Sequence, residues 1–330
     1  MAKLNETNMV QTIGYGEDEY CAAARVKIQN ACQAPEADVH FLVGGTQTNT
    51  TVIAAILRPW QGVISAVSGH INCHEAGAIE STGHKVITLP TTNGKITAQQ
   101  VQEYVEWHRN DESTEHIVQP GMVYISYPTE GGTLYSKAEL TELYDVCRRY
   151  GLPLFIDGAR LGYGVMADGA DLTLPEIAHL CDVFYIGGTK VGALFGEAVV
   201  IMNPALKKDF RFIMKQRGGR MAKGRLLGIQ FDALFTDDLY FKISRHADEM
   251  AYQIRDIFVS AGYPLLFDSP TNQQYPIMPD EELAILGKNF GYEYWERTDP
   301  THSGVRFCAS WATTQENVDA LRAAVQALKK

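Results

Sequence analysis

The feature that most constrains the fold is a regular alternation of short apolar runs with helical patterns between about residues 40 and 205. The runs are rich in Val, Ile and Tyr, as buried strands are; they are 62–67, 85–89, 122–126, 154–157, 182–186 and 198–202. Helices are expected between them, as at 97–107 and 136–150. This alternation predicts an α/β fold, with a mostly parallel sheet flanked by helices.

The pattern changes after about residue 203. Long helices are expected at 204–216 and 239–261, followed by short strands at 275–278, 292–297 and 304–310 and a last helix capped by Thr313 and Glu316. A chain of 330 residues is long enough for one large and one smaller domain. We therefore expect a large domain over 1–235 and a small α+β domain over 236–330.

Charge and cysteine content narrow the classes of function. The formal net charge of -10 disfavours nucleic acid and membrane surfaces as partners, because both are anionic. The sequence has neither an apolar run of roughly 20 residues, as a membrane span needs, nor a signal-peptide stretch at its start. Six scattered cysteines without a CxxC pair predict free thiols in a reducing cytoplasm rather than a zinc site.

A glycine turn precedes the first helix that we expect in this region, at 50–57. Gly44, Gly45 and Thr46 follow a short apolar run. Glycines before a helix N-terminus let backbone N–H groups close on a phosphate, and Thr46 adds a hydroxyl. The alternative is an ordinary helix start.

An aspartate and a lysine follow two of the predicted strands. Asp157 ends the run 154–157, where a buried acid needs a cationic partner: a protonated pyridine nitrogen would serve, and so would Arg160. Lys190 follows the Gly187-Gly188-Thr189 turn and could form an imine if it is partly desolvated beside a cationic cofactor. The alternatives are an internal Asp–Arg pair and a solvated lysine.

Two histidines, His70 and His74, follow the run 62–67. They would share one face if this segment is helical. An imidazole can stack on an aromatic cofactor and move protons. A structural histidine is the alternative for His70, and a metal site would need a third ligand that the pattern does not show.

Taken together and in this order, the motifs resemble one known family. The chain is similar to the threonine aldolase/β-eliminating lyase group of pyridoxal-phosphate (PLP) enzymes, which have the aspartate-aminotransferase-type fold (fold type I), and most of all to low-specificity L-threonine aldolases. The matching stretches are 14–18, 44–49, 70–77, 157–160, 187–190 and 305–306. The resemblance runs over nearly the whole chain.

The resemblance implies a role for each residue of the site. Lys190 would carry PLP as an imine, Asp157 would face the pyridine nitrogen and His70 would stack on the ring. The residues implied around the phosphate, the cofactor oxygen and the substrate carboxylate are Gly45, Thr46, Thr189, Arg160 and Arg306. For Arg306, a structural ion pair is the alternative.

The activity implied is cleavage of L-threonine, L-allo-threonine and related β-hydroxy-α-amino acids to glycine and an aldehyde. Alternatives on the same scaffold are a β-eliminating lyase, a phenylserine aldolase and a catalytically silent family member. The stretch 215–225 holds five cations, and the resemblance suggests that it reaches the cofactor phosphate across a dimer interface; the alternative is a solvated basic loop. A homodimer or a homotetramer is therefore expected.

Two features depart from the family pattern. Only 13 residues precede Gly14, so a substrate contact made from that segment is expected to be absent or supplied differently. Where some members carry a second histidine, this chain reads Tyr-Pro-Thr-Glu over 127–130. The sequence does not place Glu130, and His70 is the first candidate for the catalytic base, with His74 the second.

Overall fold

The computed structural model describes residues 1–329 and contains a seven-stranded sheet. Its spatial order is β1 (Asp38–Leu42), β7 (Glu197–Ile201), β6 (Val183–Gly187), β5 (Leu154–Asp157), β4 (Gln119–Ser126), β2 (Gln61–Ala66) and β3 (Val86–Leu89). β7 runs antiparallel to both of its neighbours, and the other neighbouring strands are parallel. The predicted mostly parallel sheet is confirmed.

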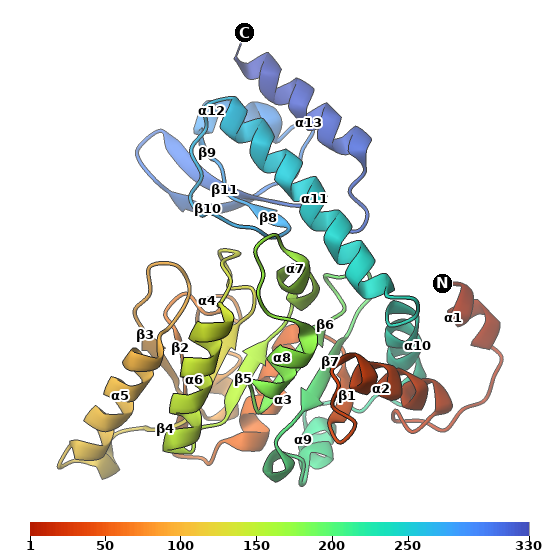
Figure 1. Cartoon of the computed structure of the whole chain (residues 1–330), viewed down its shortest axis with the longest axis vertical. Helices are drawn as coiled ribbons and strands as arrows, with labels where there is room; N and C mark the ends of the chain where they lie inside the picture. The colour runs from red at the N-terminus through yellow and green to blue at the C-terminus, as the bar shows by residue number, and fades with distance from the viewer. Residues whose placement is uncertain (330) are drawn as a thin grey trace.

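Helices cover both faces of this sheet (Figure 1). The helices of this part of the chain are α3 (Gly45–Ile56), α4 (His70–Cys73), α5 (Ala98–Asn110), α6 (Lys137–Tyr150), α7 (Leu161–Met166), α8 (Leu174–His179) and α9 (Phe210–Gln216), with short 3-10 turns at Glu80–Thr82, Thr114–His116 and Pro204–Leu206. Two apolar clusters result, because successive strand residues point to opposite faces. On β4, Val123 and Ile125 belong to the cluster that α5 and α6 cover, whereas Met122 and Tyr124 belong to the cluster with α3 and α9.

The N-terminal helices were not predicted from the sequence. They are α1 (Ala2–Thr7) and α2 (Glu19–Ala31), and α2 packs on α10 (Arg225–Leu234). The two helices approach closely at Gly228, where an added Cβ would lie 2.6 Å from the Cys21 sulfur. Figure 1 shows this group beside the β1–β7 edge of the sheet.

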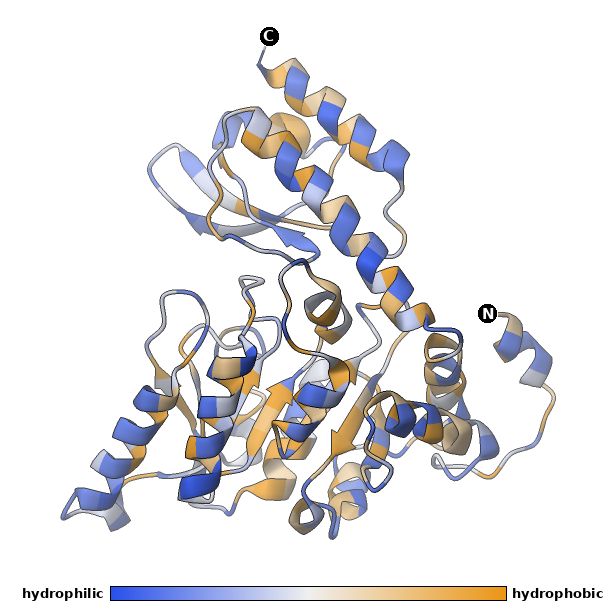
Figure 2. Cartoon of the chain, in the orientation of Figure 1, coloured by the Kyte–Doolittle hydropathy of each residue, from blue (hydrophilic) through white to orange (hydrophobic). Residues whose placement is uncertain are grey.

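The C-terminal part of the chain forms a smaller antiparallel sheet with its own apolar cluster. Its elements are α11 (Leu239–Ser260), β8 (Gln273–Gln274), β9 (Ile277–Pro279), α12 (Asp280–Leu286), β10 (Glu293–Arg297), β11 (His302–Cys308) and α13 (Gln315–Leu328). The cluster members lie between Met250 and Val325. Figure 2 shows the amphipathic pattern of these helices beside the more uniformly apolar strands of the large sheet.

Three predicted boundaries are wrong. The helix expected to begin at residue 50 begins at Gly45, because hydroxyls such as that of Thr48 bond back to the carbonyl four residues earlier and fit the helix. The helix expected over 204–216 is interrupted at Asp209, whose φ of 63° is left-handed. The last helix is capped by Thr314 and Asn317, one residue later than expected.

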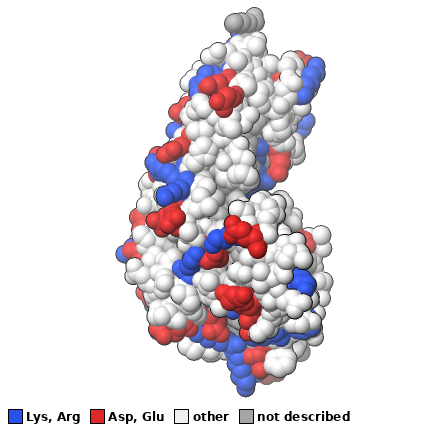
Figure 3. Space-filling model, turned by 90° about the vertical axis from the view of Figure 1, so that its right-hand side faces the viewer, with Lys and Arg blue, Asp and Glu red and all other residues white. Residues whose placement is uncertain are grey.

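The surface carries both signs of charge. In Figure 3, acidic and basic side chains are interspersed over the face shown. Within residues 1–329, no helix combines the length and the apolar character that crossing a membrane requires.

Candidate active site

A cavity of about 320 Å³ opens at the carboxyl ends of β4, β5 and β6. Ligands of open α/β sheets bind at such an edge because the loops after the strands converge there. Seven of the predicted site residues line it together: Gly45, Thr46, His70, Asp157, Arg160, Thr189 and Lys190. Residues far apart in the sequence are therefore brought together as the strand-and-helix pattern predicts.

Asp157 is the most completely hydrogen-bonded group of the cavity. It ends β5 on the α3 face of the sheet and is 4% exposed. Tyr124 and Tyr185, from the strands on either side, donate their hydroxyls to its carboxylate, Tyr124 at 2.6 Å. Asn49 on α3 donates an amide N–H at 3.0 Å. Burial opposes ionisation, but these donors outweigh it and lower the pKa of Asp157, so a buried anion faces the cavity.

The Asn49 amide also connects Asp157 to the histidine. Its Nδ2 donates to Oε1 of the buried Glu75 at 2.7 Å, and the same oxygen lies 2.8 Å from His70 Nδ1. Burial lowers the pKa of His70, but the hydrogen bond to Glu75 and the charge of Asp157 prevail and raise it. Hydrogen bonds thus connect the His70 imidazole to Asp157 through Glu75 and Asn49. Because Nδ1 of the ring is bonded to Glu75, Nε2 is the nitrogen left for other contacts.

α4 has a single turn, and His74 is its C-cap rather than a helical residue. The rings of His70 and His74 are nevertheless 5.6 Å apart between centroids. Within residues 1–329, no three His, Cys, Asp or Glu side chains are grouped as ligands of a metal ion.

Lys190 lines the same cavity and follows β6. Burial, followed by the charge of Arg160, lowers its pKa to about 8. A lysine with such a pKa is partly neutral near physiological pH and is able to act as a nucleophile. The alternative of a fully solvated lysine does not describe this side chain.

The N-terminus of α3 and the Arg160 side chain supply positive potential to the cavity. The first intrahelical bond at this end is from Thr48 N to Gly44 O, so the N–H groups of the preceding first-turn residues face outward. Within residues 1–329, the Arg160 guanidinium forms no ion pair, so the internal Asp157–Arg160 pair is not formed. Both features suit an anionic ligand.

Arg306 lies on β11 of the small sheet and is not among the residues that line the cavity. Its guanidinium pairs with Glu293, donates to Gln273 Oε1 at 3.0 Å and lies 5.4 Å from the centroid of the Trp295 ring. The Trp295 ring in turn lies 6.3 Å from that of His74. Arg306 is therefore connected through the Trp295 ring to His74, the C-cap of the helix α4 that begins at His70.

Several polar residues of the site were not predicted from the sequence: Asn49, Glu75, Tyr124, Tyr185 and Glu197. Glu130 was named from the sequence but not placed. A signal existed for the tyrosines, because a phenol inside an apolar strand needs a buried acceptor. None existed for Glu130, whose place depends on the conformation of the loop after β4. Glu197 is buried on β7, where desolvation raises its pKa to about 7.

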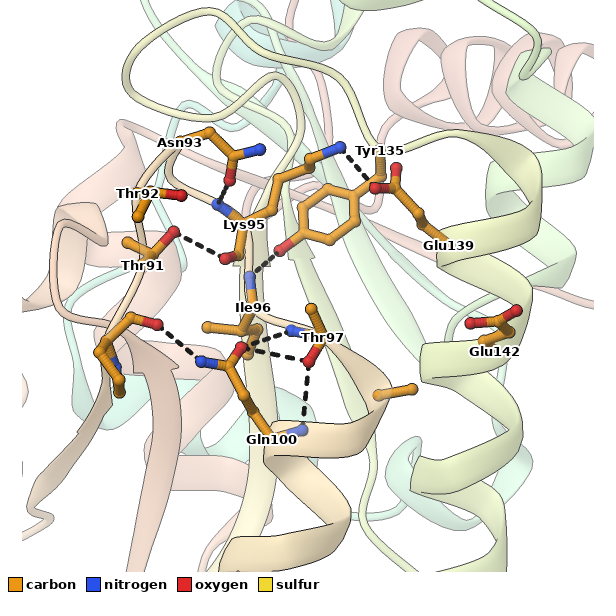
Figure 4. Close-up of a pocket in the computed structure, with 12 residues that line it drawn as sticks. Thr91, Thr92, Asn93, Lys95, Ile96, Thr97, Gln100, Tyr135, Glu139 and Glu142 are labelled. Carbon is orange, nitrogen blue, oxygen red and sulfur yellow. Dashed lines mark hydrogen bonds and ion pairs between the residues drawn. The ribbon is translucent and has the colours of Figure 1, made fainter.

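A second, larger cavity of about 480 Å³ lies between the start of α5 and α6 (Figure 4). Several of its polar groups are bonded to one another. Lys95 pairs with Glu139 at 2.6 Å, and the Tyr135 hydroxyl accepts a hydrogen bond from Ile96 N at 2.8 Å. We call it the α5–α6 pocket.

Comparison with known proteins agrees with this geometry. The chain matches the model of the beta-eliminating lyase family over residues 1–323. It is 29% identical to a low specificity L-threonine aldolase of a Pseudomonas species, over 99% of this chain and 93% of that protein. A solved threonine aldolase of Leishmania major is 42% identical and has a TM-score of 0.96, over 100% of this chain and 95% of that chain.

A more distant structure shows the fold alone. An alanine–glyoxylate aminotransferase of a Nostoc species is 14% identical, with a TM-score of 0.71 over 100% of this chain and 92% of that chain. The same layered arrangement is thus found with a very different sequence, and the expected fold is confirmed. The chain belongs to the beta-eliminating lyase family and, by its likeness to the Leishmania protein, to the threonine aldolases within it.

Proposed function

We propose that this protein is a PLP-dependent carbon–carbon lyase that cleaves L-threonine, L-allo-threonine and related β-hydroxy-α-amino acids to glycine and an aldehyde. The observation that supports it most is the pairing, across one cavity, of a lysine with a depressed pKa and a buried anionic aspartate. The family to which the chain belongs and its threonine aldolase relatives support the same function.

The residues present fit this cofactor. The Lys190 amine would attach its aldehyde, and the Asp157 carboxylate would hold its pyridine nitrogen protonated. The α3 N-terminus, with Gly45 and Thr46, would bind its phosphate, with help from Thr189. His70 would stack on its ring. When bound, PLP supplies an electron sink for a carbanion at Cα.

Arginines are the groups proposed to bind the substrate carboxylate. Arg160 already lines the cavity and has no ion-pair partner in the described part of the chain, and a forked guanidinium matches a carboxylate. Arg306 is half-buried and would act from the small domain, for which we propose the boundary near residue 235. A base must also accept the proton of the β-hydroxyl, and His70 and Glu130 are the groups available for it.

A product assay distinguishes the alternatives. The purified protein is supplied with PLP and incubated separately with threonine, phenylserine and serine. Glycine and acetaldehyde from threonine support the proposal. Ammonia and a keto acid from serine, without glycine from threonine, would instead show a β-eliminating lyase. Benzaldehyde from phenylserine as the dominant product would show a phenylserine aldolase, and absence of bound PLP would show a silent member.

We also propose that the active form is a homodimer or a homotetramer in the cytoplasm. The basic stretch 215–225 reaches the start of α3, where Gln47 Nε2 donates to Arg217 O at 3.1 Å. From there its cations could approach a cofactor phosphate in a partner subunit. All six cysteines are free thiols, which supports a reducing compartment. Sedimentation of an active monomer would contradict the proposed assembly.

A further inference from the structure

Glu130 follows β4 and lines the cavity, next to the residues proposed to hold the cofactor. Its Oε1 accepts two hydrogen bonds, from Ser126 Oγ at 2.6 Å and from the backbone N–H of His70 at 2.9 Å. Ser126 is the register partner of Asp157 on the neighbouring strand. The carboxylate is therefore held over the same strand ends as Asp157.

The small domain fixes the backbone of this residue as well. The Tyr275 hydroxyl donates to Glu130 O, and Tyr275 packs edge-on against Phe267 and Trp295. Phe267 also lies against Gly131, where an added Cβ would come within 3.3 Å of its ring. A side chain positioned from both parts of the molecule is pre-organised for a specific contact.

The second carboxylate oxygen of Glu130, Oε2, is the one that these hydrogen bonds do not use. Oε2 has no hydrogen-bond partner within residues 1–329, and it is not among the fully buried unpaired atoms. Burial raises the pKa of Glu130 even though Ser126 stabilises its anion. A carboxylate that is easier to protonate than usual is a better proton acceptor near neutral pH.

The other candidates for a base are either bonded to protein groups or absent from the cavity lining. Asp157 accepts bonds on both oxygens. Glu75 is bonded through Oε1 to Asn49 and His70, its Oε2 is fully buried, and neither Glu75 nor the exposed His74 is among the residues that line the cavity. Glu197 is 3% exposed, accepts a hydrogen bond from Gly188 N at 2.9 Å and is paired with Leu42, just before the glycine turn. It therefore lies on the phosphate side of the cavity.

His70 is poorly suited to accept the proton. One ring nitrogen is bonded to Glu75, and this contact raises the pKa of the imidazole, so the protonated ring becomes more abundant. A protonated imidazole has no free lone pair. The His70 ring can still stack on a cofactor, because stacking does not need a lone pair.

We propose that Glu130, through Oε2, is the catalytic base that accepts the proton of the substrate β-hydroxyl; this rests on the proposed aldolase function. As the O–H proton passes to the carboxylate, the oxygen lone pair forms the aldehyde C=O bond and the Cα–Cβ bond breaks. The electron pair of that bond stays with Cα, which then takes up one proton. Glu130 returns its proton to water, so glycine and the aldehyde form without a net change in protons.

The test separates C–C cleavage from chemistry that needs no β-hydroxyl. Glu130→Gln keeps an oxygen for Ser126 and His70 but removes the base. The PLP-loaded variant is assayed for threonine cleavage and for exchange of the glycine α-proton with deuterium, and its bound PLP and melting temperature are measured. Glu142→Gln, in the α5–α6 pocket, is the matched control.

We expect Glu130→Gln to lower the cleavage rate by about 10²–10⁴-fold, with glycine exchange, bound PLP and melting temperature close to those of the parent. Glu130→Asp should recover part of the cleavage, and Glu142→Gln should behave as the parent. Unchanged cleavage in Glu130→Gln would overturn the proposal, as would an equal loss of cleavage and exchange. If the parent exchanges glycine but cleaves no β-hydroxy amino acid, the proposed function itself is wrong.

Discussion

The strand-end cavity and the α5–α6 pocket differ in what their polar groups are bonded to. The α5–α6 pocket is the larger, at about 480 Å³ against about 320 Å³, yet its Lys95 and Tyr135 are bonded to neighbouring protein groups. In the strand-end cavity, the Arg160 guanidinium, the Lys190 amine and one oxygen of Glu130 have no such partner among residues 1–329. Unpaired charges at a fixed position cost stability, so they are expected where a ligand completes them. Unsatisfied polar groups, more than volume, identify the functional site here.

The largest expected effect comes from exchanging the two lysines for alanine. Lys190→Ala should abolish threonine cleavage, because no other amine in the cavity can attach the cofactor. Lys95→Ala should leave cleavage unchanged, since it only breaks the pair with Glu139. Steady-state rates of both variants measure the difference. Equal effects of the two substitutions would remove the distinction between the cavities.

Asp157→Asn should lower the cleavage rate by several orders of magnitude while the protein stays folded. The amide keeps an acceptor for Tyr124 or Tyr185 but cannot hold a proton on the pyridine nitrogen. Rates are compared with circular dichroism spectra of the same preparations. Turnover near that of the parent would reject the role of Asp157.

Arg160→Gln should act on substrate binding more than on the chemical step. A hydrogen bond to a charged group contributes roughly 1.5–3 kcal/mol, so KM for threonine should rise about 10- to 100-fold. Glycine binding should weaken to a similar extent, because the carboxylate is common to both. Unchanged affinity for both amino acids would assign the carboxylate to another group, such as Arg306.

The smallest effect on activity is expected at Asp248, an unpaired carboxyl outside the cavity. It is fully buried on α11, neither oxygen has a partner within residues 1–329, and desolvation raises its pKa to about 9 from an ordinary value of 3.8. The folded protein holds this proton to higher pH than the unfolded chain does. Its stabilising contribution is therefore complete below about pH 3.8 and is lost as the pH rises towards about 9.

Asp248→Asn should remove the loss of stability at high pH, because the amide does not ionise. We expect the free energy of unfolding at pH 8 to rise by roughly 1–3 kcal/mol, with a smaller change at pH 5 and no change in cleavage rate. Urea denaturation at the two pH values measures the free energy of unfolding of the parent and the variant. A variant that is less stable at pH 8 would contradict the destabilisation assigned to the buried carboxylate, and a loss of activity would show that this group also serves the site.

The sequence predicted the parts of the site that depend on strand ends. Asp157 and Lys190 could be placed together because adjacent strands of a parallel sheet end at one edge. Their side-chain partners could not be placed. Asn49 depends on where α3 begins, which was predicted five residues late, and Glu130 depends on a loop held by Tyr275 from the C-terminal part. Long-range contacts of this kind have no local pattern.

The helices α2 and α10 also depend on contacts between distant parts of the sequence. α2 and α10 lie about 200 residues apart in the sequence, and the face that joins them includes Gly228, a poor helix former. Their pairing depends on close contact with Cys21 rather than on propensity. By contrast, the helix expected over 136–150 is present, and Ser136 and Glu139 form its capping box, a signal that is complete within four residues.

The central claim is tested most directly by locating the attachment site of the cofactor. The protein is incubated with PLP, reduced with borohydride, digested and analysed by mass spectrometry. The account predicts one phosphopyridoxyl group per chain, on the peptide that contains Lys190, and none on that peptide's counterpart from Lys190→Ala. Stoichiometric label on a different lysine, such as Lys95, or no label at all in the parent, would contradict it.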